Sequence, residues 1–322
     1  MAGSVVITGG CGFLGAALAG RIGEHGLTLP DGRRLSDPAL HLWDRAGAAV
    51  PDLPNARFKA IDIADPGAVR AAMPDDVAVV YHLAAVVSGQ AEADYELGMR
   101  VNLGGTTAIL AAVRDVTEGL PVIGTSSLAV YGGGPKEPLT EDTQIQPQNT
   151  YGVTKAMAEL VMADYRRRGW ADARTLRLPT VTVRPGKPNA AASSFASAII
   201  RDPLKGEPAN CPVDPAMAMW IASPDAAVTA LWHAPSVPAA DWPAFGAVNV
   251  PGLRVSVADM IAALRAEAGD AVADLIQMRP DEKIKAIVGT WPTLFDTSLA
   301  VRLGFTGDAD FGAILDQALR MK

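Results

Sequence analysis

Residues 4–15 have the sequence SVVITGGCGFLG, and this stretch decides the fold. Its first five residues form a β-branched run typical of a buried strand, and the Ala- and Leu-rich residues that follow favour a helix. Between them, Gly9 permits a tight turn, Gly12 lets the backbone approach a pyrophosphate at the positive helix N-terminus, and Gly15 allows the helix to pack closely on the strand. The stretch predicts a dinucleotide-binding turn; the alternative is a glycine turn without a ligand.

Strand and helix patterns alternate from this unit up to about residue 180. Further strands are predicted at Leu40–Trp43, Phe58–Ile61, Val77–Leu83, Val122–Ser126 and Arg174–Leu178. Helices are predicted at Phe13–His25, Ala91–Val116 and Tyr151–Arg168. The alternation indicates a doubly wound α/β fold of the Rossmann type, with a parallel sheet covered on both faces.

Acidic residues follow the second and third predicted strands. Asp44 can accept both ribose hydroxyls of NAD and repels the 2′-phosphate of NADP. It lies further past the glycine loop than the usual ~20 residues, and the extra segment Leu29–Pro38 accounts for the excess. Arg45 could instead hold an NADP phosphate. Asp62 and Ile63 are expected to meet the adenine, unless Asp62 only closes a strand-end turn. The expected cofactor is NAD.

The chain changes character after Thr180, where prolines become frequent and the alternation weakens. We expect residues 1–180 to form an NAD-binding Rossmann domain. Residues 181–322 are expected to form a smaller, loop-rich substrate-binding part, with some of its chain returning to the sheet. Within that part, Ser256–Asp259 predicts a helix N-cap, and Phe311–Leu319 predicts an amphipathic helix.

Composition excludes several classes of protein. The 322 residues are 49% hydrophobic, which is enough for a large core. The net charge of −7 offers no basic surface for nucleic acid or for an anionic membrane. No apolar run approaches the ~18 residues of a membrane span, and the first residues lack the basic start of a signal peptide. The two cysteines, Cys11 and Cys211, fit neither a disulfide framework nor a zinc site. No bound metal is expected. The protein is expected to work in the reducing cytoplasm.

Two further segments carry chemistry. Ser126 and Ser127 end the fifth predicted strand, while Tyr151 and Lys155 lie one turn apart on the same face of a helix. Tyrosine is a poor base at its free pKa of about 10. A neighbouring ammonium and a positive nicotinamide ring both favour the phenolate and lower that pKa. Tyr-x-x-x-Lys alone is common on helix surfaces, but after the glycine loop and the Ser-Ser strand end it predicts proton transfer in a dehydrogenase.

With these motifs the whole chain resembles the extended short-chain dehydrogenases/reductases, the superfamily of nucleotide-sugar epimerases and dehydratases. The resemblance implies that Tyr151 takes the hydroxyl proton while hydride moves to nicotinamide C4. It also implies that Ser127 hydrogen-bonds the reacting oxygen and that Lys155 holds the nicotinamide ribose. Asn102 matches the helical asparagine of the superfamily. The expected cofactor-binding positions are Gly9, Gly12, Phe13, Leu14, Gly15, Asp44, Asp62, Ile63, Leu83, Ala84, Ala85, Asn102, Ser126, Tyr151, Lys155 and Leu178.

The segment after the sixth strand departs from the sugar-nucleotide pattern, because Thr180 stands where those enzymes usually carry asparagine. The run Arg184–Asn189 and the stretch Trp220–Asp225 resemble the D-erythronate dehydrogenase branch, which oxidises C2 of a four-carbon sugar acid with NAD. Arg184 offers a fork for a carboxylate and Lys187 offers a second charge, unless both are solvated loop residues. The expected substrate-binding positions are Ser88, Ser127, Tyr151, Thr180, Arg184 and Lys187.

Two rival functions stay open on the sequence. A nucleotide-sugar epimerase or dehydratase on the same fold would need a grip on a diphosphate, which Arg201 or Arg254 could supply. The second rival function is that of a non-catalytic NAD-sensing protein. The presence of all three catalytic residues, Ser127, Tyr151 and Lys155, argues against it. The resemblance also implies a homodimer joined by paired helices.

Overall fold

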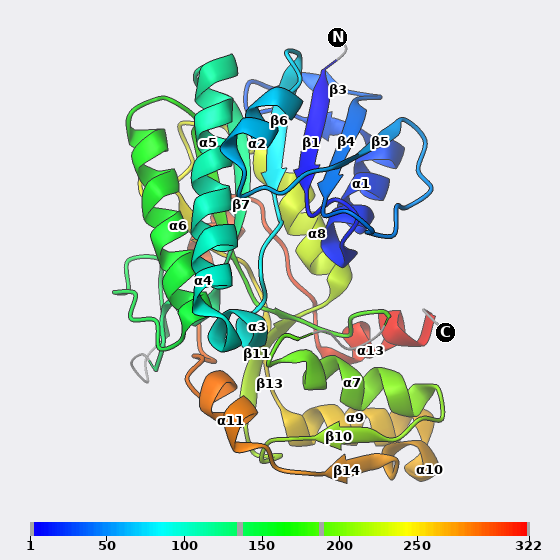
Figure 1. Ribbon diagram of the computed structural model, residues 1–322. Coiled ribbons are helices and arrows are strands. Elements are labelled where there is room, and N and C mark those ends of the chain that lie inside the picture. Colours follow the sequence, from blue (N-terminus) through cyan, green and yellow to red (C-terminus); the bar gives the residue numbers. More distant parts are fainter. Residues whose placement is uncertain (1–2, 134–137, 187–189, 321–322) are drawn as a thin grey trace.

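A seven-stranded parallel sheet is the main feature of the computed structural model, which describes residues 3–133, 138–186 and 190–320 (Figure 1). The strand order is β12-β8-β7-β6-β1-β4-β5, and every neighbouring pair is parallel. The strands are β1 (Ser4–Thr8), β4 (Ala39–Asp44), β5 (Ala56–Ala60), β6 (Val77–His82), β7 (Pro121–Ser127), β8 (Asp172–Leu178) and β12 (Ala247–Asn249). Because the chain order reverses between β1 and β6, a crevice is expected there at the carboxyl ends of the strands.

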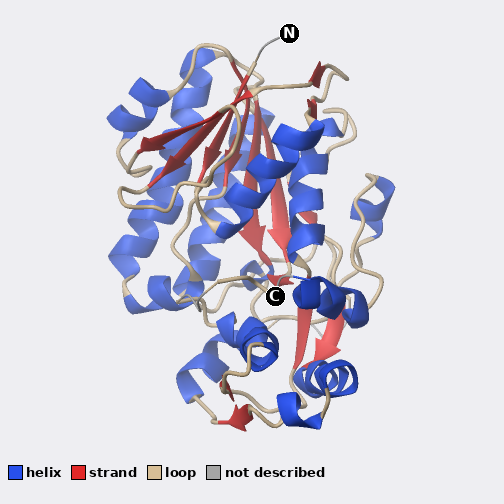
Figure 2. Ribbon diagram, turned by 90° about the vertical axis from the view of Figure 1, so that its right-hand side faces the viewer, coloured by secondary structure: helices blue, strands red, loops and turns tan. Residues whose placement is uncertain are grey.

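Helices cover both faces of this sheet, as Figure 2 shows. One face is covered by α1 (Phe13–His25) and α8 (Pro224–His233), which pack on each other. The other is covered by α2 (Pro66–Ala72), α5 (Gly105–Val116) and α6 (Thr150–Arg167). Each face buries its own apolar cluster against the sheet. The doubly wound Rossmann-type fold expected from the sequence is confirmed.

A smaller part lies beyond the carboxyl ends of the strands and has its own apolar core (Figure 1). Its helices are α7 (Ser194–Leu204), α9 (Val257–Ala268), α10 (Asp270–Ala273), α11 (Glu282–Val288) and α13 (Phe311–Arg320). Its strands are β9 (Thr180–Val181), β10 (Ala209–Cys211), β11 (Ala218–Ala222), β13 (Leu253–Ser256) and β14 (Ile276–Met278). Ser256 and Asp259 form the expected capping box at the start of α9.

The chain crosses back to the sheet between these segments. Strand β12 extends the sheet by pairing with β8, and the preceding helix α8 packs on α1. The short remaining elements are β2 (Leu27–Thr28), β3 (Arg34–Leu35), η2 (Leu128–Val130), η3 (Ala234–Ser236) and α12 (Ser298–Arg302). Strands β2 and β3 form a ribbon within the extra segment before β4. None of the helices among the described residues is long and apolar enough to cross a bilayer.

One predicted element is wrong. The sequence predicts a single helix over Ala91–Val116, but the chain is divided there into α3 (Ser88–Ala93), α4 (Tyr95–Gly98), the π-helix η1 (Met99–Gly104) and α5. The division falls at Asp94, whose backbone is not helical (φ −138°, ψ 90°) and whose carboxylate accepts the backbone N–H of Leu97 at 3.0 Å. Asp94 thus ends one helix and caps the next, as aspartate at an N-cap commonly does.

Candidate active site

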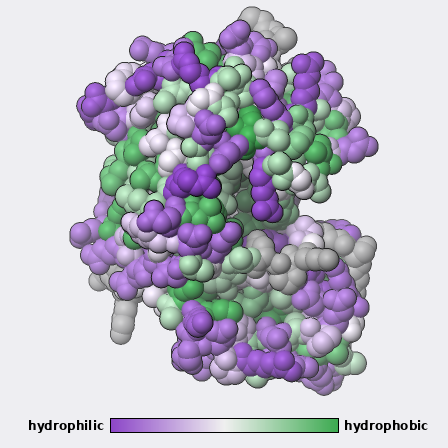
Figure 3. Space-filling model, viewed as in Figure 1, coloured by the Kyte–Doolittle hydropathy of each residue, from purple (hydrophilic) through white to green (hydrophobic). Residues whose placement is uncertain are grey.

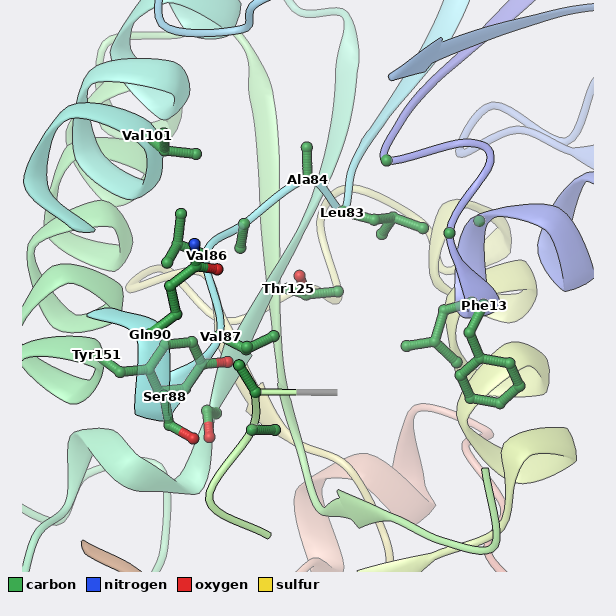
Figure 4. A pocket seen from close by; sticks show the side chains of 18 of the residues that line it. Phe13, Leu83, Ala84, Val86, Val87, Ser88, Gln90, Val101, Thr125 and Tyr151 are labelled. Carbon is green, nitrogen blue, oxygen red and sulfur yellow. The ribbon is translucent and has the colours of Figure 1, made fainter. Parts of the chain in front are cut away.

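A cavity of about 1130 Å³ lies at the carboxyl ends of the strands, between the sheet and the smaller part. The surface is visibly hollowed between these two regions (Figure 3). Every site residue predicted from the sequence lines the cavity except Asn102, which lies behind its wall, and Lys187, which lies outside the described residues. Figure 4 shows Tyr151 and Ser88 on one side of the cavity and Phe13 on the other.

The glycine loop forms one end of the cavity. Gly9 has a φ of 67°, and a Cβ there would lie 2.9 Å from the backbone nitrogen of Ala84, so only glycine fits between β1 and the loop after β6. A Cβ on Gly15 would overlap the carbonyl oxygen of Gly9. The N-cap of α1 is Gly12, which has no side chain to bond the first helical N–H groups. Those donors can therefore bind a phosphate.

Asp44 ends β4 beside the glycine loop, and backbone donors fix its carboxylate. Its Oδ2 accepts the N–H of Cys11 at 3.1 Å, and its Oδ1 accepts the N–H of Arg45 at 2.8 Å. A carboxylate fixed at this strand end suits ribose hydroxyls. Arg45 lines the cavity beside it.

Asp62 lies further along the same wall, after β5. Its Oδ2 accepts a hydrogen bond from Arg100 Nη1 at 2.8 Å, and its Oδ1 accepts the N–H of Ala64 at 3.0 Å. The pKa of Asp62 is lowered, first by the Ala64 N–H and then by Arg100. Asp62 therefore closes a strand-end turn and faces the cavity at the same time.

Tyr151 is the central titratable group of the cavity. Burial raises the pKa of Tyr151 to about 12, against the lowering effects of a hydrogen bond with Ser127 and of the Arg184 charge. The sequence predicted that Lys155 would lower this pKa. Instead, Lys155 Nζ donates to the carbonyl oxygen of Thr125 at 2.8 Å and lies 5.8 Å from the centre of the Tyr151 ring. Arg184, far away in sequence, acts on the phenol because the segment after β9 lines the same cavity.

Lys155 is itself perturbed. Burial lowers the pKa of Lys155 to about 8, opposed by the negative charge of Glu159 one turn further along α6. His82, at the end of β6, makes buried hydrogen bonds with Thr8 (2.9 Å) and Thr106 (3.1 Å). Burial, assisted by Lys155, lowers the pKa of His82 to about 3. His82 is thus a neutral structural residue beneath the cavity.

Asn102 holds the wall in place from behind. In η1, its Oδ1 accepts the N–H of Val86 at 2.7 Å, and its Nδ2 donates to the carbonyl oxygen of Val86 and to Thr154 Oγ1, both at 3.1 Å. It is 3% exposed and does not line the cavity, so a direct cofactor contact does not follow from its position. Its geometry is that of a positioning residue, joining the loop after β6 to α6.

Several cavity residues were not predicted from the sequence. Gln90, Ser193, Ser194, Ser197 and Trp291 line the cavity, as does Arg201, which the sequence raised only for a rival function. Arg254, raised with it, does not line the cavity; it lies on β13 and bonds Thr293 weakly at 3.4 Å. The two arginines could not be separated at that point, because neither α7 nor β13 was predicted from the sequence. No cluster of three possible metal ligands occurs within residues 3–133, 138–186 and 190–320.

Comparisons with known proteins agree with this site. The model of the NAD dependent epimerase/dehydratase family matches residues 5–222. The chain is 48% identical over 97% of its length to a D-erythronate dehydrogenase of Cupriavidus necator, of which it covers 96%. It is 38% identical to one of Haemophilus influenzae, covering 97% of this chain and 98% of that one.

Among solved structures, the chain resembles one described as a nucleoside-diphosphate-sugar epimerase from Agrobacterium tumefaciens. The two are 34% identical with a TM-score of 0.90, over 99% of this chain and 94% of the other. Three observations agree. The family model matches most of the sheet, the likeness to these proteins extends over nearly the full chain, and one cavity holds the glycine loop with Ser127, Tyr151 and Lys155. The chain belongs to the NAD dependent epimerase/dehydratase family.

Proposed function

We propose that this protein is an NAD-dependent dehydrogenase that oxidises a small sugar acid, D-erythronate at C2 to the 2-keto acid. The observation that carries the proposal is that Tyr151, Ser127 and Arg184 line one cavity, where Ser127 hydrogen-bonds the phenol and the Arg184 charge lowers its pKa. A proton acceptor, a hydroxyl for the reacting oxygen and a cation for a carboxylate are thereby within reach of one small molecule. The two relatives named D-erythronate dehydrogenase support the same substrate.

The cavity suits NAD. The glycine loop leaves no room for a Cβ at Gly9 or Gly15, and no side chain caps the first N–H groups of α1, which can therefore meet the pyrophosphate. The Asp44 carboxylate is held at the end of β4, where it suits the adenosine ribose. The nicotinamide of bound NAD supplies the hydride acceptor. Residues 1–180 provide most of these groups, and residues 181–322 provide Arg184 and the cavity wall from α7. We therefore assign cofactor binding to the first part and substrate binding mainly to the second.

The side chains of this protein then divide the work of the reaction. Ser127 donates to the C2 oxygen and holds it beside the phenol of Tyr151, which takes the hydroxyl proton. Lys155, bonded to the Thr125 carbonyl, holds the nicotinamide ribose. Arg184 binds the carboxylate, which directs C2 rather than C3 to the reacting position. Ser88 and Thr180 lie on the same cavity and suit the remaining hydroxyls.

The test is NADH formation with D-erythronate, L-threonate, D-glucuronate and UDP-glucose, with NAD and NADP. We expect activity with NAD on the four-carbon acids. Arg184→Ala should raise KM for erythronate by about 10- to 100-fold, since a charged hydrogen bond contributes about 1.5–3 kcal/mol. NAD affinity should change little. Unchanged erythronate kinetics in Arg184→Ala would contradict the carboxylate assignment.

A nucleotide-sugar epimerase is the second candidate, favoured by the description of the Agrobacterium relative. It would need a diphosphate grip, yet Arg254 is outside the cavity and the Arg201 charge is paired with Asp202. Activity on UDP-glucose alone in the same assay would favour this candidate.

We further propose a homodimer working in the reducing cytoplasm. Leu160, on α6, is 52% exposed, which suits a paired-helix contact, and Cys11 and Cys211 are both free thiols. Light scattering on the purified protein tests the dimer, and a monomer at micromolar concentration would exclude it. Fractionation of the producing cells tests the compartment.

A further inference from the structure

Arg201 is built into the cavity wall next to Arg184. It lies four residues after Ser197 on α7, so the two side chains share one helix face. Ser197 Oγ accepts the backbone N–H of Arg184 at 3.0 Å, and Arg201 Nη1 donates to the carbonyl oxygen of Arg184 at 3.2 Å. Helix α7 therefore holds both backbone groups of Arg184, and it brings the Arg201 guanidinium beside the proposed carboxylate-binding arginine.

The Arg201 guanidinium is buried but not fully bonded. Arg201 is 7% exposed, and its Nε donates to Asp202 Oδ1 at 2.7 Å. Its Nη2 is buried with no hydrogen-bond partner among the residues the structure describes. A buried charged donor left unpaired is costly, so such groups at a cavity wall commonly meet a ligand acceptor.

The two arginines also act on each other electrostatically. Burial and the positive charge of Arg201 lower the pKa of Arg184. Like charges this close, away from water, disfavour one another, and an anion bound between them is attracted by both. Asp202, 17% exposed, offsets one of the two positive charges. The trio Arg184, Arg201 and Asp202 therefore carries one net positive charge, which matches one carboxylate and not a diphosphate.

We propose that Arg184 and Arg201 together form a clamp for a single substrate carboxylate, and that Asp202 limits the clamp to a monoanion. Arg201 is then a specificity-determining residue: its Nη2 donates to the carboxylate while its Nη1 holds Arg184 in place. This inference rests on the proposed function, because it assigns the acid group of that substrate to a defined pair of side chains.

Binding measured separately from turnover tests the clamp. D-Erythronate and its uncharged amide are titrated into the enzyme–NADH complex by calorimetry, and NADH formation from erythronate is measured in parallel. Wild type should prefer the acid over the amide. Arg201→Gln should weaken acid binding about 10- to 100-fold and reduce that preference, because a charged hydrogen-bond partner is lost. NADH affinity reports the integrity of the fold.

Three further variants sharpen the test. Arg201→Gln combined with Asp202→Asn avoids an unpaired carboxylate, and it should lose the acid preference even if the single variant folds poorly. Arg254→Gln removes an arginine outside the cavity and should change neither ligand's affinity. Asp202→Asn alone raises the net charge, so it should improve binding of tartrate, a four-carbon dicarboxylate, relative to erythronate.

The outcomes separate the clamp from the proposed function. An acid preference that is absent in wild type, or that survives in both Arg201 variants, overturns the clamp even if erythronate is oxidised. Arg201-dependent binding of erythronate without NADH formation supports the clamp and removes the proposed function. An unchanged tartrate-to-erythronate ratio in Asp202→Asn overturns the role given to Asp202.

Discussion

At the scale of single residues, the phenol of Tyr151 lies between opposing influences. Burial raises the pKa of Tyr151 to about 12, whereas Ser127 and Arg184 lower it. Both lowering groups are ones that the proposed substrate would also contact. Substrate that binds to Ser127 and Arg184 would therefore alter the proton affinity of Tyr151.

Tyr151→Phe removes the hydroxyl and keeps the ring. We expect kcat to fall by about 10²- to 10⁴-fold, the usual contribution of general acid–base catalysis, while NAD affinity stays within a few fold. Stopped assays of NADH formation and a fluorescence titration with NAD measure the two quantities. Tyr165→Phe, on the same helix but outside the cavity, is the control and should keep normal turnover. Substantial residual kcat in Tyr151→Phe would contradict the assignment.

Asp44→Ala tests the nucleotide preference. NAD should be preferred in wild type, because the fixed carboxylate would face the 2′-phosphate of NADP. The variant should bind NAD less tightly by about 1.5–3 kcal/mol, the contribution of a charged hydrogen bond, and discriminate less between the two nucleotides. KM values for both nucleotides measure this, with the exposed Asp31→Ala as control. A wild type that uses both equally well would mean that Arg45 governs the site.

At the scale of elements, the start of α6 fixes the catalytic geometry. Asn149 caps the helix by accepting the N–H of Gly152 at 2.8 Å. A Cβ on Gly152 would lie 2.4 Å from the carbonyl oxygen of Ala129, so glycine lets α6 approach the turn that follows Ser127. This close approach explains how Tyr151, in the first turn of α6, meets a serine at the end of β7.

Asn149→Ala should therefore reduce both stability and activity. Loss of an N-cap typically costs about 1 kcal/mol, and a frayed first turn would displace Tyr151. Urea denaturation and kcat measure the two effects. Asp281→Ala removes the cap of α11, distant from the cavity, and should lower stability similarly while kcat is kept. Equal kcat in both variants would show that the α6 cap does not contribute to catalysis. Asn149→Asp keeps a capping side chain and should restore activity.

At the scale of the whole molecule, a buried polar network connects the catalytic helix to the far strands of the sheet. Arg177 on β8 pairs with Glu159 on α6 at 2.7 Å, and both side chains are 1% exposed. Arg177 also donates to the Tyr131 hydroxyl at 2.5 Å, and that hydroxyl bonds Asn249 on β12 at 2.8 Å. The returning strand is thus tied to the helix that carries Tyr151 and Lys155.

Glu159→Ala would leave the Arg177 charge buried and unpaired. Removal of one partner of such a pair typically costs about 3–5 kcal/mol, and we expect a loss of that size in the free energy of unfolding. Asp270→Ala breaks an exposed pair with Arg265 and should cost at most about 1 kcal/mol. Chemical denaturation of both variants provides the comparison. A Glu159→Ala variant as stable as Asp270→Ala would show that the network is dispensable.

The sequence by itself determined the features that contiguous residues encode. The bounds of β1 and α1 follow from one strand–glycine–helix run, and the shared face of Tyr151 and Lys155 follows from helical spacing. The same logic placed the strand-end residues of the cavity lining, because parallel strands end at one edge of the sheet.

Only the tertiary structure decided which distant residues meet. It divided the predicted helix at Asp94, set Asn102 behind the wall, and brought Arg184 to Tyr151 and Arg201 to Arg184. Arg201 is buried in the cavity wall and Arg254 lies outside the cavity, a difference that depends on how α7 and β13 pack. Burial and charge proximity depend on packing between segments that are far apart in the chain, whereas periodicity reports only on neighbours within one segment.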